Sequence, residues 1–561
     1  MKKTALVLTL IIILAATLRL FALSTADPLG DEVLYSFRAI GPMDFDTAAL
    51  QTTPLEWFDP DIPVWTNLSF HDHPPLVFLI QHFFLRLFGE NNFAFRLPSV
   101  LFGVASVYLI YLLSRRLFTS RAAPLFAAAL LAVTINQVFI SRTGLQESIV
   151  IFFILFTLFF IQCASPDNPR FFYAAGAALG LGLLSKYTAA IAAIIGLFYL
   201  LSSNCPAFKN RHLWGGLLLA VLLFSPVIFY NLKLYQSVGH FDFQISYILG
   251  QRPEVWASAP GKEEIGTLSN RLSAFLPTLI GSNSPLLLLL AAASLFTLRR
   301  RHALIYISLA SLILLYLFIG PTVRFLTMLT PFLILPAAAF FDFIILRAPS
   351  LTRLFYFSTA IFLILAAELA FTANTLFPPR PFGQSRLTYA PLVVAETSRW
   401  GYNQLDSYLT AELANRFPAR VFDSRYQFIS NRQDDSLAAA RAASFSPYAA
   451  LIIYDDSLWN VSQLWILDRR QIYHGWPTIK IEDFLAATSE NGPDYFRRSG
   501  FTNFYFILPS PDIPLKNLPT ETGVSFASRL SLAGLSPLVI SSPSATPAFS
   551  VFKWTAAQIN I

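Results

Sequence analysis

The chain has 561 residues, of which 55% are hydrophobic and only 13% are charged. A soluble domain has roughly 25% charged residues, and the mean hydropathy here is +0.54, so a large soluble enzyme is excluded and an integral membrane protein is indicated. The net charge of +7 does not indicate nucleic acid, because the basic residues cluster at the ends of apolar runs. Cys163 and Cys205 have neither a CxxC nor a metal-binding spacing, so neither a disulfide framework nor a zinc site is expected.

Apolar runs of about 17–25 residues, the length that crosses the hydrocarbon core, recur along the first two thirds of the chain. They predict a polytopic α-helical protein with about eleven spans. The predicted spans are residues 4–24, 97–118, 122–140, 146–163, 171–186, 188–203, 213–230, 276–298, 303–320, 325–346 and 353–373. Lys2 and Lys3 precede the first span, and basic residues recur in every second connection after it. The positive-inside rule therefore places the N-terminus in the cytoplasm and the chain after the last span on the opposite side of the membrane. We expect that membrane to be the plasma or inner membrane.

The first run could instead be a cleaved signal peptide, since "ALSTA" (22–26) is a passable cleavage site. The run is long, however, and Arg19 lies inside it. Its removal would also upset the alternation of basic connections. A retained helix is therefore favoured.

Two outer connections, residues 25–96 and 231–275, are too long to be simple turns. The first is rich in acids and contains the segment 75–89, which is apolar on nearly all sides but too short to span. We expect this segment to form a helix that lies in the membrane interface. Residues 1–373 are thus predicted to form one transmembrane domain.

The composition changes after residue 373, and residues 374–561 hold no spanning run. "ALIIYDD" (450–456), "TNFYFILP" (502–509) and "AFSVFKW" (548–554) have the pattern of strands. Residues 399–417 have the pattern of an amphipathic helix. These elements predict a C-terminal extracytoplasmic α/β domain.

An adjacent pair of acids, Asp31 and Glu32, follows the first apolar run directly. The pair could be part of an ordinary acidic outer loop. A carboxylate held between lipid and water can also have a raised pKa, which suits a general base.

A second candidate site is "FHDHPPLVF" (70–78), in which Asp72 and His73 precede two prolines. Prolines restrict the backbone before a helix start, so this pair could be fixed to bind a polar ligand, or it could simply lead into the helix. His71 and His73 could share one face of an extended segment, but two ligands are too few for a metal site.

Two ionisable residues lie next to apolar runs. Glu147 opens the run 146–163, and Lys186 separates two apolar segments. Such positions are costly and indicate function, but Glu147 could instead pair with Arg142, and Lys186 could extend to the interface. The nearby glycines Gly176, Gly180 and Gly182 indicate close helix packing rather than nucleotide binding, since no dinucleotide fingerprint or P-loop occurs.

Further cations are predicted on the outer side, where Arg324 opens the tenth span and Arg252 and Arg271 belong to the second long connection. A phosphate leaving group or head group needs nearby cations of this kind to stabilise its negative charge.

Taken in order, "GDEVLYSFRAI", "HDHPPLVFLIQHFF", "SRTGLQESIVIFF", "GLGLLSKYTAA" and "VRFLTMLTPFLILPAAAF" resemble motifs of the GT-C glycosyltransferases that use polyprenyl-phosphate sugars. The branch most similar contains protein O-mannosyltransferases and the lipid A aminoarabinose transferase. The resemblance covers residues 1–346. It implies that Asp31 is the catalytic carboxylate, that Asp72 shapes the site and that His73 approaches the lipid phosphate. It also places Glu147, Lys186 and Arg324 on recurring acidic and basic positions and leaves open which of Arg252, Arg271 and Arg324 contacts phosphate.

The resemblance implies an inverting transfer of a sugar from a polyprenyl-phosphate donor in the bilayer to a protein, glycolipid or polysaccharide. No cofactor is required, although the acidic segment "DFD" (44–46) could hold a divalent metal. A polytopic lipid or sugar transporter is the alternative from another class, but it predicts an inverted repeat that we do not find. A non-catalytic binder of lipid-linked sugar is a third reading.

Overall fold

The computed structural model describes residues 2–28, 30–41, 64–69, 73–249, 251, 267–294, 297, 302–347, 351–377, 393, 399–424, 427–458, 460–513 and 518–558. The chain divides into two compact units. The first comprises Met1–Leu23, Pro42–Trp57 and Val64–Thr397, and the second comprises Ser24–Gly41, Phe58–Pro63 and Ser398–Ile561. The start of the predicted first outer loop thus groups with the C-terminal residues.

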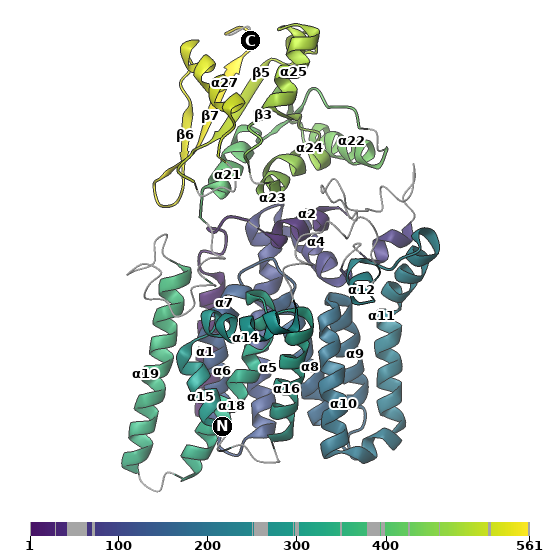
Figure 1. Cartoon of the computed structure of the whole chain (residues 1–561), viewed down its shortest axis with the longest axis vertical. Coiled ribbons are helices and arrows are strands. Elements are labelled where there is room, and N and C mark those ends of the chain that lie inside the picture. The colour runs from purple at the N-terminus through teal and green to yellow at the C-terminus, as the bar shows by residue number, and fades with distance from the viewer. Residues whose placement is uncertain are drawn as a thin grey trace. The chain divides into compact units, whose positions relative to one another are not determined.

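The first unit consists of helices (Figure 1). Its elements are α1 (Lys2–Leu20), η1 (Val64–Leu68), α4 (Leu76–Phe88), α5 (Asn92–Leu117), α6 (Ala122–Val133), α7 (Ile135–Ile140), α8 (Glu147–Cys163), α9 (Phe171–Ser185), η2 (Tyr187–Ala190), α10 (Ile191–Ser203), η3 (Cys205–Lys209), α11 (Arg211–Val238), α12 (Phe243–Ile248), α14 (Leu268–Ser282), α15 (Pro285–Ser294), α16 (Ala303–Ile319), α17 (Val323–Leu326), α18 (Thr330–Arg347) and α19 (Leu351–Leu376). Every predicted span contains helix.

The lengths of these helices differ from the prediction of about eleven uniform spans. Among the described residues, five helices are long and apolar enough to cross a membrane, or six if the bent pair α14–α15 is one span. The other apolar helices have 10–17 residues, which is at or below the length that crosses the hydrocarbon core. The protein is therefore a multi-pass membrane protein, and the count of eleven stays a prediction.

Two predicted spans are interrupted. The span 122–140 breaks at Thr134, which has extended backbone angles between α6 and α7. The span 276–298 breaks between α14 and α15, which are bent by 116°. Ser284 precedes Pro285 at this break, and a residue before proline is pushed away from helical angles. A continuous helix over 276–298 was therefore the wrong expectation.

Helices α9 and α11 approach each other through glycines. A Cβ added to Gly176 would lie 1.9 Å from the carbonyl oxygen of Gly216, and a Cβ added to Gly216 would lie 2.2 Å from that of Phe172. Only glycine allows backbones this close, as in small-residue contacts between membrane helices. The packing role predicted for Gly176 is confirmed.

The second unit contains the β-sheets. Its elements are α2 (Asp31–Ile40), α21 (Tyr402–Glu412), β1 (Arg416–Pro418), α22 (Gln427–Ala442), β2 (Ser446–Tyr448), β3 (Ala450–Tyr454), α23 (Asn460–Gln463), the π-helix η6 (Leu464–Asp468), α24 (Arg469–His474), β4 (Thr478–Lys480), α25 (Ile481–Asn491), α26 (Tyr495–Arg498), β5 (Asn503–Pro509), α27 (Glu521–Leu532), β6 (Leu538–Ser541) and β7 (Pro547–Thr555). The strands predicted in 450–456, 502–509 and 548–554 are β3, β5 and β7. The helix predicted over 399–417 ends earlier, and its last residues belong to β1.

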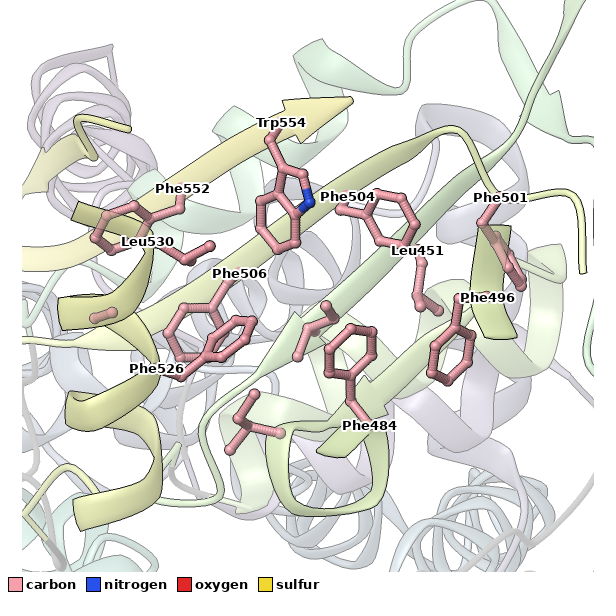
Figure 2. Packing of buried hydrophobic residues seen from close by; sticks show 13 residues of the cluster. Leu451, Phe484, Phe496, Phe501, Phe504, Phe506, Phe526, Leu530, Phe552 and Trp554 are labelled. Atoms are coloured by element: carbon pink, nitrogen blue, oxygen red, sulfur yellow. The ribbon is translucent and has the colours of Figure 1, made fainter. Parts of the chain in front are cut away.

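The five-stranded sheet has the order β4-β3-β5-β7-β6. Strand β3 runs parallel to β4 and β5, and β7 runs antiparallel to β5 and β6. Alternate side chains form rows across one face, such as Ile453–Phe506–Phe552. Phe526 of α27 packs edge-on against Phe506 at 5.0 Å, and Phe484 of α25 joins the same cluster (Figure 2). This aromatic core holds α25 and α27 on the sheet.

Candidate functional site

A buried ion pair connects the ends of two neighbouring helices in the first unit. Glu147 is the first residue of α8, and Lys186 directly follows α9. The Lys186 Nζ lies 2.8 Å from Glu147 Oε1, and the two side chains are 5% and 1% exposed. A helix N-terminus favours an acid and a C-terminus favours a base, so both charges stand where the helix dipoles stabilise them.

A cationic and an aromatic residue of α17 also interact with the pair. Arg324 on the short helix α17 interacts electrostatically with Glu147, and the Lys186 ammonium lies 5.0 Å from the centre of the Phe325 ring. Thr322 caps α17 by accepting from the backbone N–H of Phe325. Glu147, Lys186 and Arg324, which are far apart in the sequence, are thus brought together.

One carboxylate oxygen of this site makes no hydrogen bond to any described residue. In the part of the chain that the structure describes, Glu147 Oε2 is buried without a hydrogen bond. Lys186 donates one described side-chain hydrogen bond, to Glu147, although an ammonium can donate three. A buried acceptor beside unused N–H groups suits a polar ligand that both donates and accepts.

The alternative pairing of Glu147 with Arg142 is wrong. The Arg142 guanidinium donates to the carbonyl oxygens of Leu18, Arg19, Phe21 and Ala22. It also lies 4.9 Å from the centre of the Phe377 ring. Arg142 therefore caps the end of α1, where carbonyl groups lack helical partners.

His73 lies directly before the two prolines that lead into α4, as the proline pattern predicted. Its ring is buried and meets Phe78 edge-on at 6.3 Å. Val77, in the first turn of α4, packs in one cluster with Ile149, two residues after Glu147. The helix that follows His73 therefore packs against α8 close to Glu147.

The remaining cations and acids have different positions. Arg271 Nη1 donates to the carbonyls of Leu317 and Phe318 at the end of α16, at 3.2 and 2.7 Å. This contact caps that helix. The predicted residues Asp72 and Arg252, and the segment 44–46, lie outside the described residues. Among the described residues, no group of three or more His, Cys, Asp or Glu side chains could hold a metal.

A buried network beside Lys186 escaped the sequence analysis. The Tyr187 hydroxyl donates to Asp242 Oδ2, which also accepts from Asn231 Nδ2 at 2.9 Å. The backbone N–H of Asp242 donates in return to Asn231 Oδ1 at 2.9 Å. Asp242 is fully buried, and a carboxylate within the aromatic stretch "GHFDFQ" was the signal that could have found it. The network ties the second long connection to α11 and η2.

Asp31 and Glu32 belong to the second unit, at the start of α2. Asp31 is half-buried and Glu32 is buried. Gly30 precedes them with φ +64° and ψ −153°, a backbone conformation that is essentially restricted to glycine. The structure therefore separates the two acids by exposure, since Asp31 is the one that solvent reaches more easily.

Known proteins are similar to this chain in part of its sequence and in its fold. The model of the dolichyl-phosphate-mannose-protein mannosyltransferase family matches residues 72–230. The putative mannosyltransferases YycA and YkcB of Bacillus subtilis (strain 168) are each 31% identical over 157 and 142 residues, which are 28% and 25% of this chain. The aligned regions span 22% and 20% of those relatives.

The crystal structure of ArnT from Cupriavidus metallidurans bound to undecaprenyl phosphate is similar over 99% of both chains. The TM-score is 0.50 and the sequence identity is 14%, so the similarity concerns the fold. The matched segment 72–230 contains His73, Glu147 and Lys186. In this segment and in its fold, the chain resembles the GT-C glycosyltransferases, as its motifs predicted.

Proposed function

We propose that the chain transfers a sugar from a polyprenyl-phosphate donor to an acceptor on the extracytoplasmic side of the membrane, with inversion at the anomeric carbon. The observation that carries the proposal is the buried Glu147–Lys186 pair, which lies within residues 72–230, the segment that matches a mannosyltransferase family. Arg324, from outside that segment, interacts with Glu147. The undecaprenyl phosphate in the ArnT structure supports a donor of this lipid class.

The cations act on the leaving group. As the bond from the anomeric carbon to the phosphate oxygen breaks, negative charge grows on the polyprenyl phosphate. Lys186 has N–H donors beyond the one that it gives to Glu147, and Arg324 adds a second positive charge. Lys186 is buried, where the low dielectric makes such stabilisation strongest, and Arg324 is half-buried. In this mechanism His73 helps to bind the phosphate from the start of α4.

Asp31 acts on the acceptor. Its carboxylate takes the proton of an acceptor hydroxyl or amine, whose lone pair attacks the anomeric carbon while the polyprenyl phosphate leaves. A single displacement of this kind inverts the configuration. The role comes from the resemblance, and the half-buried position of Asp31 supports it, because a base must be reachable by its substrate.

The step as proposed uses no resident metal, because the donor already carries a phosphate leaving group and protein cations stabilise it. Turnover that is unchanged by a chelator would support this part of the proposal. Turnover that is lost with the chelator and restored by a divalent cation would refute it.

The decisive test uses the full-length protein in lipid nanodiscs with a panel of polyprenyl-phosphate sugars, mannose first. Asp31→Asn is expected to lower turnover by about 10²–10⁴-fold, the usual contribution of a general base. Asp434→Asn, at an exposed acid of α22, is the control, since it removes a carboxylate outside the proposed site and is expected to keep turnover. Near-normal turnover of Asp31→Asn would refute the assignment of the base.

One observation favours a transporter as the second candidate. The break between α14 and α15 places Asn283 in a buried network, where Asn136 Nδ2 donates to Asn283 Oδ1 at 2.9 Å and to Thr330 Oγ1 at 2.8 Å. Interrupted helices with buried polar groups are typical of transporters. The same panel of donors separates the candidates, because a transporter moves the lipid-linked sugar unchanged whereas a transferase consumes it.

A further inference from the structure

The segment that carries Asp31 is attached to the C-terminal residues by a buried carboxylate. Asp27 accepts hydrogen bonds from the backbone N–H groups of Trp400, Gly401 and Asn403, the last two at 3.1 and 2.9 Å. Asn403 Nδ2 donates back to the carbonyl of Ser24 at 2.9 Å. These amides open helix α21, so a residue from the start of the chain caps a helix that lies almost 400 residues later.

The local electrostatics favour this attachment. Asp27 is 3% exposed, and burial raises the pKa of its carboxyl, while the hydrogen bonds from the backbone amides oppose that shift. Arg399 adds an electrostatic attraction to Asp27. A helix N-terminus and a nearby guanidinium both stabilise negative charge. Asp27 is therefore held by several groups of the same unit at once.

A second attachment lies near the other end of α2. The Tyr473 hydroxyl donates to the carbonyl of Phe37 at 2.9 Å, and the two rings are 5.1 Å apart. Gly41 faces the same ring, since an added Cβ would lie 2.8 Å from Tyr473 Cε1. Helix α2 also contacts α23 and η6. Asp31 lies in the sequence between the two attachments.

We infer that the C-terminal residues position the catalytic base: Asp27 and Tyr473 are positioning residues that fix α2, and through it the Asp31 carboxylate. This inference rests on the proposed function. It assigns the C-terminal unit a part in the chemical step, in addition to any contact with the acceptor. It follows from two independent attachments, one on each side of Asp31, that join the same helix to the same unit.

The test compares Asp27→Ala, Asp27→Asn and Tyr473→Phe in the full-length protein in nanodiscs, with Asp434→Ala, at an exposed acid of α22, as the matched control. Amide hydrogen exchange of α2 and of residues 400–403 reports the attachment, and kcat and KM for the donor report its effect. Asp27→Ala is expected to speed exchange in both segments and to lower kcat by about 10²-fold, since a misplacement of about 1 Å costs that much. KM for the donor should change by less than about twofold, because the phosphate-binding residues are untouched.

Asp27→Asn keeps one acceptor oxygen and is expected to recover part of kcat. Tyr473→Phe keeps the ring, so it remains informative if Asp27→Ala fails to fold, and it should lower kcat less than Asp27→Ala. Faster exchange with unchanged kcat in either variant would overturn the positioning role, as would a loss of kcat with α2 fully protected. If Asp31→Asn itself turns over normally, the assignment of Asp31 as the base fails, and the exchange data still show separately whether the attachment exists.

Discussion

Removing the positive charge of Lys186 while Glu147 keeps its negative charge is the strongest test of the buried pair. Lys186→Met preserves the length and apolar stem of the side chain but leaves the Glu147 carboxylate, 1% exposed, without its partner at 2.8 Å. An unpaired buried charge of this kind costs about 3–5 kcal/mol of stability. Arg324 remains to attract Glu147, so we expect a value near the lower end, about 3 kcal/mol.

The double variant sharpens the expectation. Glu147→Gln combined with Lys186→Met replaces both charges by neutral groups of similar size, so the desolvated carboxylate is no longer present. The double variant should therefore be more stable than Lys186→Met alone. The coupling between the two sites should lie at the upper end of the range of about 0.5–3 kcal/mol that is typical of residues in contact.

The assay is reversible unfolding of the unmodified protein, Lys186→Met, Glu147→Gln and the double variant in mixed detergent, followed by tryptophan fluorescence, with sugar transfer measured in parallel. All three variants should lose transfer activity, because the pair is proposed to hold the phosphate. The unfolding free energies are therefore needed to show the cost of leaving the Glu147 carboxylate unpaired, because the loss of sugar transfer is the same in all three variants. Additive losses, with the double variant as unstable as the sum of the single ones, would refute the reasoning.

Three further predictions concern other parts of the chain. Gly30→Ala places a side chain at φ +64° and ψ −153° and should lower the unfolding free energy by about 1–3 kcal/mol. It should also lower turnover, since Asp31 follows Gly30 directly. An unchanged unfolding midpoint would contradict this. Burial raises the pKa of Asp468 from 3.8 to about 6, so its contribution to stability is present below pH 4 and is lost as the pH rises through 6. Asp468→Asn should therefore stabilise the protein at pH 7.5 by up to about 3 kcal/mol and have little effect at pH 4, which denaturant titrations at both pH values would show. Arg271→Met should lower the unfolding free energy by about 1–3 kcal/mol through the lost cap on α16 and leave KM for the donor unchanged, whereas a large increase in KM would indicate phosphate binding.

The sequence predicted the positions of the apolar helices and the strands of the aromatic core, because both follow from local periodicity. It also singled out Glu147 and Lys186, since a charge beside an apolar run is conspicuous. The breaks at Thr134 and Asn283 were missed because hydropathy averages over a polar residue. At the second break the Ser284–Pro285 pair was the available signal.

The partners of the charged residues could not be read from the sequence. Glu147 is closer in sequence to Arg142 than to Lys186, yet the packing of α8 against α9 decides the pairing. The attachment of Asp27 to α21 was equally hidden, because it joins residues 373 to 376 positions apart. Contacts of this range depend on the folded topology, which spacing along the chain does not encode.

The glycine contact between α9 and α11 also influences the position of Lys186, which directly follows α9. The helix runs as one rod from Phe171 to Ser185, about 22 Å at 1.5 Å per residue, and Lys186 stands at its far end. Because Gly176 and Gly216 touch backbone to backbone, any larger side chain there must push the rod away from α11. Such a substitution would therefore also move the Lys186 ammonium relative to Glu147, so the geometry of the buried ion pair depends on a helix contact several turns away along α9.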